Sequence, residues 1–228
     1  MTAMNALIED ENITLSMDTL VSTMDENSRT VPSYFTQKFE YLPFAKSVIA
    51  GTGNFEVIKQ AFEMSRRILA CEVDTLSEII SDCFEQLDRD KYGITDTSTT
   101  TVYIFGFTDA GETRAYALRS TNNFQAEIVA GTGNNKLLIK PNLMSVEGFA
   151  EEIEKANDSD DLDQSLVDIM RAEKKYDDER DDKVGIGGEN IRLVLGNDSN
   201  VAICGKIDTF DDYLDQYQFA LDKMHEQL

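Results

Sequence analysis

The order of strand-like and helix-like segments constrains the fold of this chain more than any other feature. Strand patterns come in runs and helix patterns come in adjacent pairs, so the two do not alternate singly as they do in a parallel α/β protein. This order predicts antiparallel sheets with helices packed on their outer faces, an α+β fold. No low-complexity linker interrupts the chain, so residues 1–228 are expected to form one domain.

The individual elements follow from hydrophobic periodicity. Ile13, Leu15 and Met17 alternate with polar residues, which is typical of a half-buried strand. The polar segment 21–35 contains a proline and is expected to be a loop. The expected strands are 3–9, 13–19, 34–42, 45–50, 100–106, 114–118, 126–130, 190–195 and 201–207. The expected helices are 55–69, 74–87, 145–156, 161–177 and a C-terminal helix covering 210–224.

One pentapeptide occurs twice. Ala50-Gly-Thr-Gly-Asn54 recurs at 130–134, and each copy follows an apolar strand. The repeat predicts equivalent corners of two stacked sheets, and the alternative is chance recurrence of a glycine-rich turn. Neither copy completes a dinucleotide-binding motif, because the third glycine is missing.

Charge and targeting signals exclude several classes of partner. The formal net charge is −22 at pH 7, which opposes binding to nucleic acid or to an anionic membrane. Its simplest role is solubility, and the alternative is an acidic surface that docks onto a basic partner. No apolar run is long enough to cross a bilayer and the N-terminus lacks a signal-peptide pattern, so a cytoplasmic location is expected.

Metal and cofactor chemistry is not expected. Cys71, Cys83 and Cys204 are too widely spaced for a metal or redox motif and are expected to be reduced, buried thiols. His225 is the sole histidine, which leaves too few ligands for a zinc site. The acidic segment 88–99 lacks the glutamate that a calcium loop needs at its last position.

The candidate chemistry lies near the N-terminus. Thr2 becomes terminal if Met1 is removed, and a terminal threonine carries its own general base, the α-amine. A lysine ammonium beside it favours loss of a proton from the amine and the hydroxyl, and a carboxylate would hold that lysine in place. Lys38 and Asp18 are the candidates for these two roles.

The residues around these positions resemble proteasome β-subunits, which are N-terminal-nucleophile (Ntn) hydrolases. The step from Thr2 to Asp18, the segment Gln37–Pro43, the segment 48–53 and the pair Gly187-Gly188 carry the resemblance. It implies a four-layer αββα sandwich with antiparallel sheets. It also implies roles for six residues. Thr2 would be the nucleophile, Lys38 would activate it, and Asp18 would orient Lys38. The backbone N–H of Gly51 would bind the oxyanion, the hydroxyl of Thr132 would support the nucleophile, and Asp182 would be the carboxylate near the amine.

The late part of the pattern departs from the family. Ile186 stands where the family has a serine, and Asp182 matches the family carboxylate only with a one-residue shift. The resemblance implies a threonine peptidase in a ring-type homo-oligomer, with peptide or protein substrates and an ATPase or scaffold partner. A catalytically inactive scaffolding subunit, for example of a viral or phage particle, is the alternative. A third alternative is an amidase that acts on small molecules.

Overall fold

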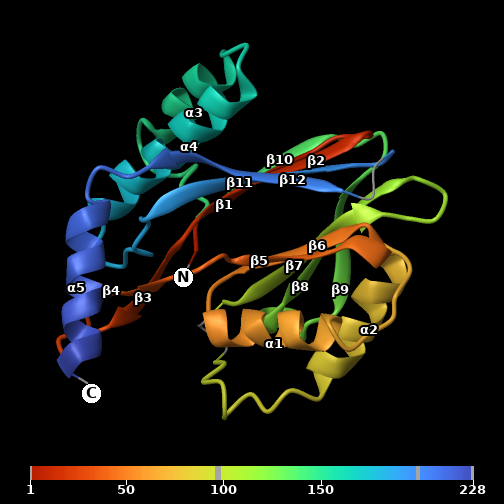
Figure 1. The fold of residues 1–228 in the computed structure, drawn as a ribbon, viewed down its shortest axis with the longest axis horizontal. Coiled ribbons are helices and arrows are strands. Elements are labelled where there is room, and N and C mark those ends of the chain that lie inside the picture. The colour runs from red at the N-terminus through yellow and green to blue at the C-terminus, as the bar shows by residue number, and fades with distance from the viewer. Residues whose placement is uncertain (1, 96–98, 199–200, 227–228) are drawn as a thin grey trace.

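Two five-stranded antiparallel sheets face each other at the centre of the molecule (Figure 1). The computed structural model describes residues 2–95, 99–198 and 201–226. In the first sheet the strand order is β10-β1-β2-β11-β12, and in the second it is β5-β6-β7-β8-β9. The first contains β1 (Met4–Ile8), β2 (Asn12–Asp18), β10 (Lys136–Lys140), β11 (Glu189–Gly196) and β12 (Ala202–Thr209). The second contains β5 (Phe39–Leu42), β6 (Ser47–Thr52), β7 (Thr101–Phe107), β8 (Thr113–Arg119) and β9 (Ala126–Gly131).

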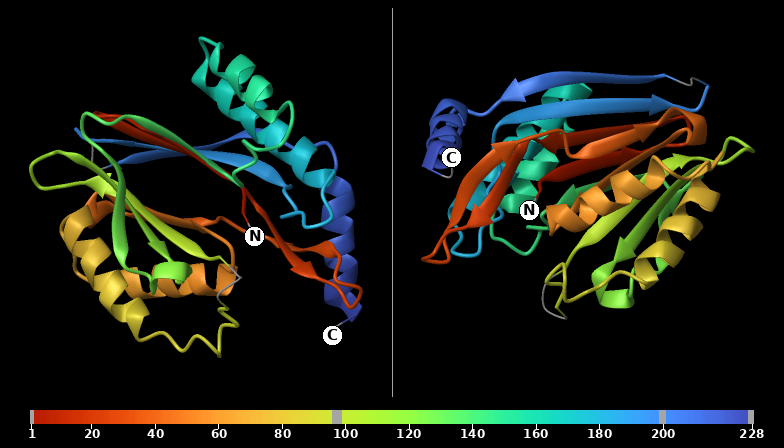
Figure 2. Two further views of the ribbon diagram at one scale, coloured as in Figure 1. Left: turned by 180° about the vertical axis from the view of Figure 1, so that it is seen from behind. Right: turned by 60° about the horizontal axis from the view of Figure 1, so that its bottom comes forward.

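Helices cover the outer face of each sheet. Helices α1 (Phe55–Ser65) and α2 (Val73–Glu85) pack against the second sheet through a continuous apolar cluster. Helices α3 (Phe149–Asn157) and α4 (Leu162–Asp178) cover the first sheet (Figures 1 and 2). The predicted four-layer αββα sandwich with antiparallel sheets is therefore confirmed.

Strand alternation explains how polar residues reach the functional region. In β2, Ile13, Leu15 and Met17 are buried between the two sheets. Burial of one such side chain contributes about 1.5–3 kcal/mol, so a one-residue slip of the strand is strongly disfavoured. The alternating positions, which end at Asp18, therefore turn to the opposite face of the sheet.

The expectation of a loop over 21–35 is wrong. This segment forms the hairpin of β3 (Leu20–Met24) and β4 (Thr30–Phe35), and Pro32 lies beside a register shift in the pairing. A proline is tolerated in an edge strand at such an irregularity, where it need not donate a ladder hydrogen bond. Helix α5 (Tyr213–Glu226) packs on β4, and the hairpin and helix project together from the sandwich (Figure 2).

Other expectations also need correction. Strand β10 was not expected, α1 ends at Ser65 rather than 69, and α3 begins at Phe149 rather than 145. The two pentapeptide copies end β6 and β9 of the same sheet, not equivalent strands of two sheets. The thiols are free, but Cys71 and Cys204 are exposed and Cys83 is only partly buried, because they lie on outward positions of their segments.

None of the helices in the described part of the chain has the length and apolar character that a membrane crossing requires. Within the same residues, no group of three or more histidine, cysteine, aspartate and glutamate side chains could hold a metal ion.

Candidate active site

The β1–β2 hairpin brings Asp18 to the N-terminal segment. Met4 pairs with Met17, and the backbone N–H of Ala3 donates a hydrogen bond of 2.9 Å to Asp18 Oδ1. The peptide that follows Thr2 is therefore attached to the side chain that ends β2. The strand pairing sets this contact, because a different register would bring another side chain to Ala3.

Lys38 reaches the same carboxylate from the start of β5. Its Nζ lies 2.7 Å from Asp18 Oδ1, and both side chains are fully buried. Burial lowers the pKa of Lys38, and the charge of Asp18 opposes that effect. The ammonium and the amide of Ala3 thus converge on one oxygen, in a place that water does not reach.

The hydroxyl of Thr2 is buried and unsatisfied. Thr2 is 2% exposed, and its Oγ has no hydrogen-bond partner among the described residues. A buried hydroxyl without a partner costs about 1–3 kcal/mol, so such a group points to a ligand or a reacting group that would complete it.

Thr2 borders a pocket of about 340 Å³, which we call the Thr2 pocket. The turn between β6 and α1, the end of β8 and the end of β10 form its walls. A second pocket of about 450 Å³ shares Gly53, Thr99 and Val184 with it and extends along β3. The lining of the Thr2 pocket includes Thr2, Thr52, Gly53, Arg119, Lys140 and Asn142.

Gly51 lies in β6, just before the turn that lines the Thr2 pocket. A Cβ at Gly51 would lie 2.7 Å from Ile58 Cγ1 and 2.8 Å from the carbonyl oxygen of Thr101. Glycine is therefore required here so that α1 can pack closely on the sheet. This packing role is independent of the oxyanion role that the sequence resemblance implies.

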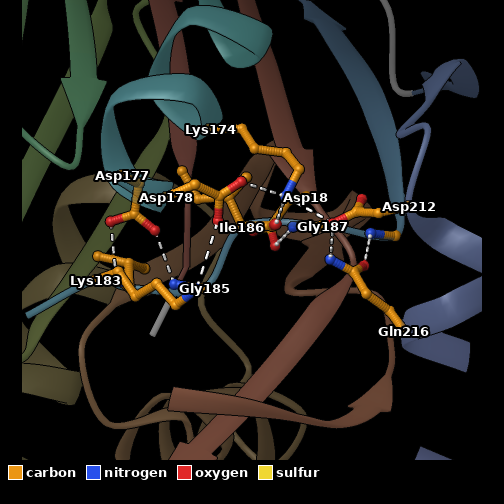
Figure 3. A network of polar contacts seen from close by, with 12 residues as sticks. Asp18, Lys174, Asp177, Asp178, Lys183, Gly185, Ile186, Gly187, Asp212 and Gln216 are labelled. Atoms are coloured by element: carbon orange, nitrogen blue, oxygen red, sulfur yellow. Dashed lines mark hydrogen bonds and ion pairs between the residues drawn. The ribbon is translucent and has the colours of Figure 1, made fainter. Parts of the chain in front are cut away.

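The loop before β11 is held by charged side chains of α4 and by α5 (Figure 3). Asp177 accepts hydrogen bonds from the N–H groups of Val184 and Gly185, at 2.8 and 2.9 Å. Lys174 donates to the carbonyl oxygen of Ile186 at 3.1 Å, and its Nζ also lies 2.9 Å from Asp178 and Asp212. These bonds fix the backbone that carries Val184 into the Thr2 pocket.

The same loop contacts Asp18. The N–H of Gly187 donates to Asp18 Oδ2 at 3.3 Å, so both oxygens of this carboxylate are engaged. Ile186 is buried and packs with Ala3, Val184 and Phe210. The position at which the family has a serine is thus part of an apolar contact beside the N-terminal segment.

Two predicted site residues lie elsewhere. The carboxylate of Asp182 is 78% exposed and forms a two-bond ion pair with Arg180, so the loop carries it away from Thr2 and Asp177 anchors the loop instead. Thr132 is exposed and accepts from the N–H of Thr113, at the end of β1 opposite to Thr2. The structure therefore does not bring Asp182 or Thr132 to Asp18 and Lys38.

A buried polar pair lies under the first sheet close to Asp18. The amide nitrogen of Asn5 donates to Glu173 Oε2 at 2.8 Å, and both side chains are fully buried. Burial raises the pKa of Glu173 well above its usual value, and repulsion from Asp18 and Asp177 adds to this effect. Asn5 Oδ1 and Glu173 Oε1 have no partner in the described chain, and a protonated Glu173 supplies the O–H donor that the pair lacks.

Sequence reasoning missed the residues that flank Thr2 in space. Arg119, Lys140 and Asn142 line the Thr2 pocket, but none is close to Thr2 in sequence. The segment 136–142 has the apolar centre of a short strand followed by a proline, which is the signal that could have identified β10 and its end. Lys140 and Asn142 reach Thr2 through the pairing of β10 with β1, where Lys140 pairs with Met4, whereas Arg119 comes from β8 of the other sheet.

Comparison with known proteins identifies the fold. No protein-family model and no curated protein sequence matches the chain. Solved structures of Anbu do match it. An Anbu mutant from Hyphomicrobium sp. strain MC1 has a TM-score of 0.62 and 10% identity, with 100% of this chain and 96% of that chain covered.

Two further Anbu structures agree. Anbu, the ancestral beta-subunit, from Yersinia bercovieri has a TM-score of 0.59 and 10% identity over 99% of this chain and 97% of that one. Another Anbu structure from Hyphomicrobium sp. strain MC1 has a TM-score of 0.60 and 12% identity over 100% and 96%. The similarity covers the whole sandwich at very low identity, and this chain therefore has the proteasome-like fold of Anbu subunits.

Proposed function

We propose that this protein is an N-terminal threonine hydrolase that cleaves amide bonds, with peptides as the expected substrates. The observation that carries the proposal is the buried Asp18–Lys38 pair, which is hydrogen-bonded to the peptide following Thr2, next to an unsatisfied Thr2 hydroxyl at a pocket. A buried lysine–carboxylate pair is costly to maintain, and a site that must favour deprotonation of a nearby hydroxyl gives it a purpose.

In the proposed reaction, Thr2 Oγ attacks the carbonyl carbon of the scissile amide. The hydroxyl proton passes to the α-amine of Thr2, which is free once Met1 has been removed, and the charge of Lys38 stabilises the oxyanionic nucleophile. The proton is then given to the leaving nitrogen as the C–N bond breaks. Water hydrolyses the resulting Thr2 ester, and the backbone N–H of Gly51 is the proposed donor to the oxyanion.

A labelling experiment tests this function. The intact mass of the purified protein establishes whether the chain starts at Thr2. A peptide β-lactone should then acylate the protein once per chain and the label should map to Thr2. Thr2→Ala should abolish labelling, whereas Thr2→Ser should retain it, and Thr132→Ala is the matched control because Thr132 lies at the other end of β1. Equal labelling of the Thr2→Ala variant would refute the proposal.

A second candidate, an inactive structural subunit of the same fold, is favoured by one observation. Ile186 replaces a hydroxyl residue and packs against Ala3, while Asp182 points to solvent, so the network around a free Thr2 amine is reduced. A retained Met1 together with absence of β-lactone labelling would support this candidate. Under both candidate functions we propose that the protein assembles into a ring of identical subunits. Mass photometry of the native protein tests this assembly.

A further inference from the structure

The Thr2 pocket differs in charge from the rest of the molecule. The chain has 43 acidic and 21 basic residues. Nevertheless, Arg119 and Lys140 line the Thr2 pocket, and none of the described residues that line it carries a carboxylate. In a strongly acidic protein, a cavity whose described lining residues carry only positive charges, next to the candidate nucleophile, calls for a specific explanation.

Lys140 is held at this place by the strand pairing. It ends β10 and pairs with Met4, two residues from Thr2, and its neighbour on the same face, Leu138, contacts the core between the sheets. Its side chain is half-buried and forms no ion pair with any described residue. Burial lowers the pKa of Lys140, and repulsion from Arg119 and Lys136 lowers it further.

Arg119 approaches the same pocket from the facing sheet. It ends β8, where it pairs with Thr101, and its guanidinium contacts Glu127 of β9. That contact uses one of the two terminal nitrogens, Nη1. A guanidinium has five N–H donors, so Arg119 keeps donors for a ligand while Glu127 holds its position. Two like charges in one pocket repel each other, and a bound anion would relieve that repulsion.

We propose that the Thr2 pocket binds a carboxylate of the substrate, so that the enzyme prefers amide bonds next to an acidic group. This inference rests on the proposed hydrolase function and names its substrate class. The carboxylate comes either from an aspartate or glutamate side chain or from a free C-terminus close to the scissile bond. Lys140 is the main determinant because no protein carboxylate among the described residues competes for it.

Matched substrates test the preference. Fluorogenic peptides that differ only in Glu against Gln beside the scissile bond address a side-chain carboxylate. Peptides with a free or an amidated C-terminus address a terminal one. Loss of one charge-assisted hydrogen bond lowers kcat/KM by roughly 10- to 100-fold, so we expect the wild type to discriminate to that extent within one of the two pairs.

Two variants then assign the effect. Lys140→Met should remove most of the discrimination, and Lys140→Glu should reverse it in favour of substrates with a lysine at that position. Lys136→Met is the matched control, because Lys136 lies on the same face of β10 but is exposed and does not line the pocket. An equal loss of substrate discrimination in Lys136→Met and Lys140→Met would overturn the inference, since the discrimination would then come from the overall positive charge of β10 and not from a contact in the pocket.

A binding measurement separates this inference from the proposed function. Thr2→Ala should bind a labelled acidic peptide more tightly than its amide analogue, as measured by fluorescence anisotropy, and Lys140→Met should abolish the difference. Hydrolysis of both analogues at equal rates would overturn the inference and leave the hydrolase function intact. Absence of hydrolysis with Lys140-dependent binding would remove the function and support the anion site. Absence of both hydrolysis and selective binding would overturn both.

Discussion

Replacing Glu173 by glutamine should change how the stability of this protein depends on pH. Glu173 is fully buried, bonds to Asn5 and lies close enough to Asp18 and Asp177 for their charges to act on it. Because the folded state raises the pKa of this carboxyl, the native protein binds a proton that the unfolded chain releases. Stability from this group is therefore fully present below the ordinary glutamate pKa and is lost as pH rises toward and through the folded-state value.

The magnitude follows from proton linkage. While Glu173 stays protonated in the native state and is ionised in the unfolded chain, each pH unit removes about 1.4 kcal/mol of unfolding free energy. Above the ordinary glutamate pKa the wild type should therefore lose stability relative to Glu173→Gln, and the loss should continue for as long as the native carboxyl stays protonated. The other titrating groups are common to both proteins, so the difference between the two isolates Glu173.

Urea unfolding followed by circular dichroism at several pH values measures this difference. Glutamine keeps an acceptor for the Asn5 amide and adds a donor for its carbonyl oxygen, so the variant should fold. Glu154→Gln is the control, because it makes the same chemical change at a glutamate that is exposed on α3. Parallel stability curves for the wild type and Glu173→Gln would contradict this prediction, because they would require Glu173 to be ionised in the folded protein.

Two further perturbations test the core of the site. Asp18→Asn removes the charge that faces the buried ammonium of Lys38 and should destabilise the protein by about 3–5 kcal/mol. The double variant Asp18→Leu with Lys38→Met removes both charges, so its loss of stability in urea unfolding should be smaller than the sum of the losses of its two single variants. Strict additivity of the two single losses would contradict this. Gly51→Ala should cost about 1–3 kcal/mol in thermal unfolding, because the new methyl group would collide with Ile58 of α1. Gly205→Ala, at an open position of β12, should leave the stability nearly unchanged, and a similar loss there would contradict the packing argument.

Local patterns predicted much of the fold because burial imposes them directly on the sequence. The alternation in β2 and the three- to four-residue spacing in α1 and α2 each identify an element and its buried face. The sequence does not reveal the hairpin of β3 and β4, because its turn at 25–29 consists of charged and polar residues and β4 contains a proline. This hairpin packs mostly against α5, so the apolar alternation that marks the central strands is weak there.

In the candidate site, too, the sequence predicts some residues and leaves their contacts undetermined. Thr2, Asp18 and Lys38 could be selected from residue type and spacing, because a threonine nucleophile needs a base, a nearby cation and a carboxylate that holds the cation. The register of β1 with β2 attaches the N–H of Ala3 to Asp18, and the start of β5 brings Lys38 to the same carboxylate. Asp182 follows from the family resemblance with a one-residue shift, but in the structure its carboxylate faces solvent, and Asp177 is the residue that binds the loop backbone.

The amino-acid sequence alone specifies the class of fold, the buried faces of β2, α1 and α2, and a short set of residues suited to threonine chemistry. Periodicity and residue chemistry are properties of neighbouring positions, and each can be read without knowing the rest of the chain. Lys140 and Arg119 share a pocket with Thr2, and Thr132 lies at the other end of β1, because of contacts that exist only in the folded chain. Lys140 reaches Thr2 through the pairing of β10 with β1, two segments more than a hundred residues apart, and Arg119 reaches it because the second sheet faces the first. No local pattern specifies the register of such a pairing.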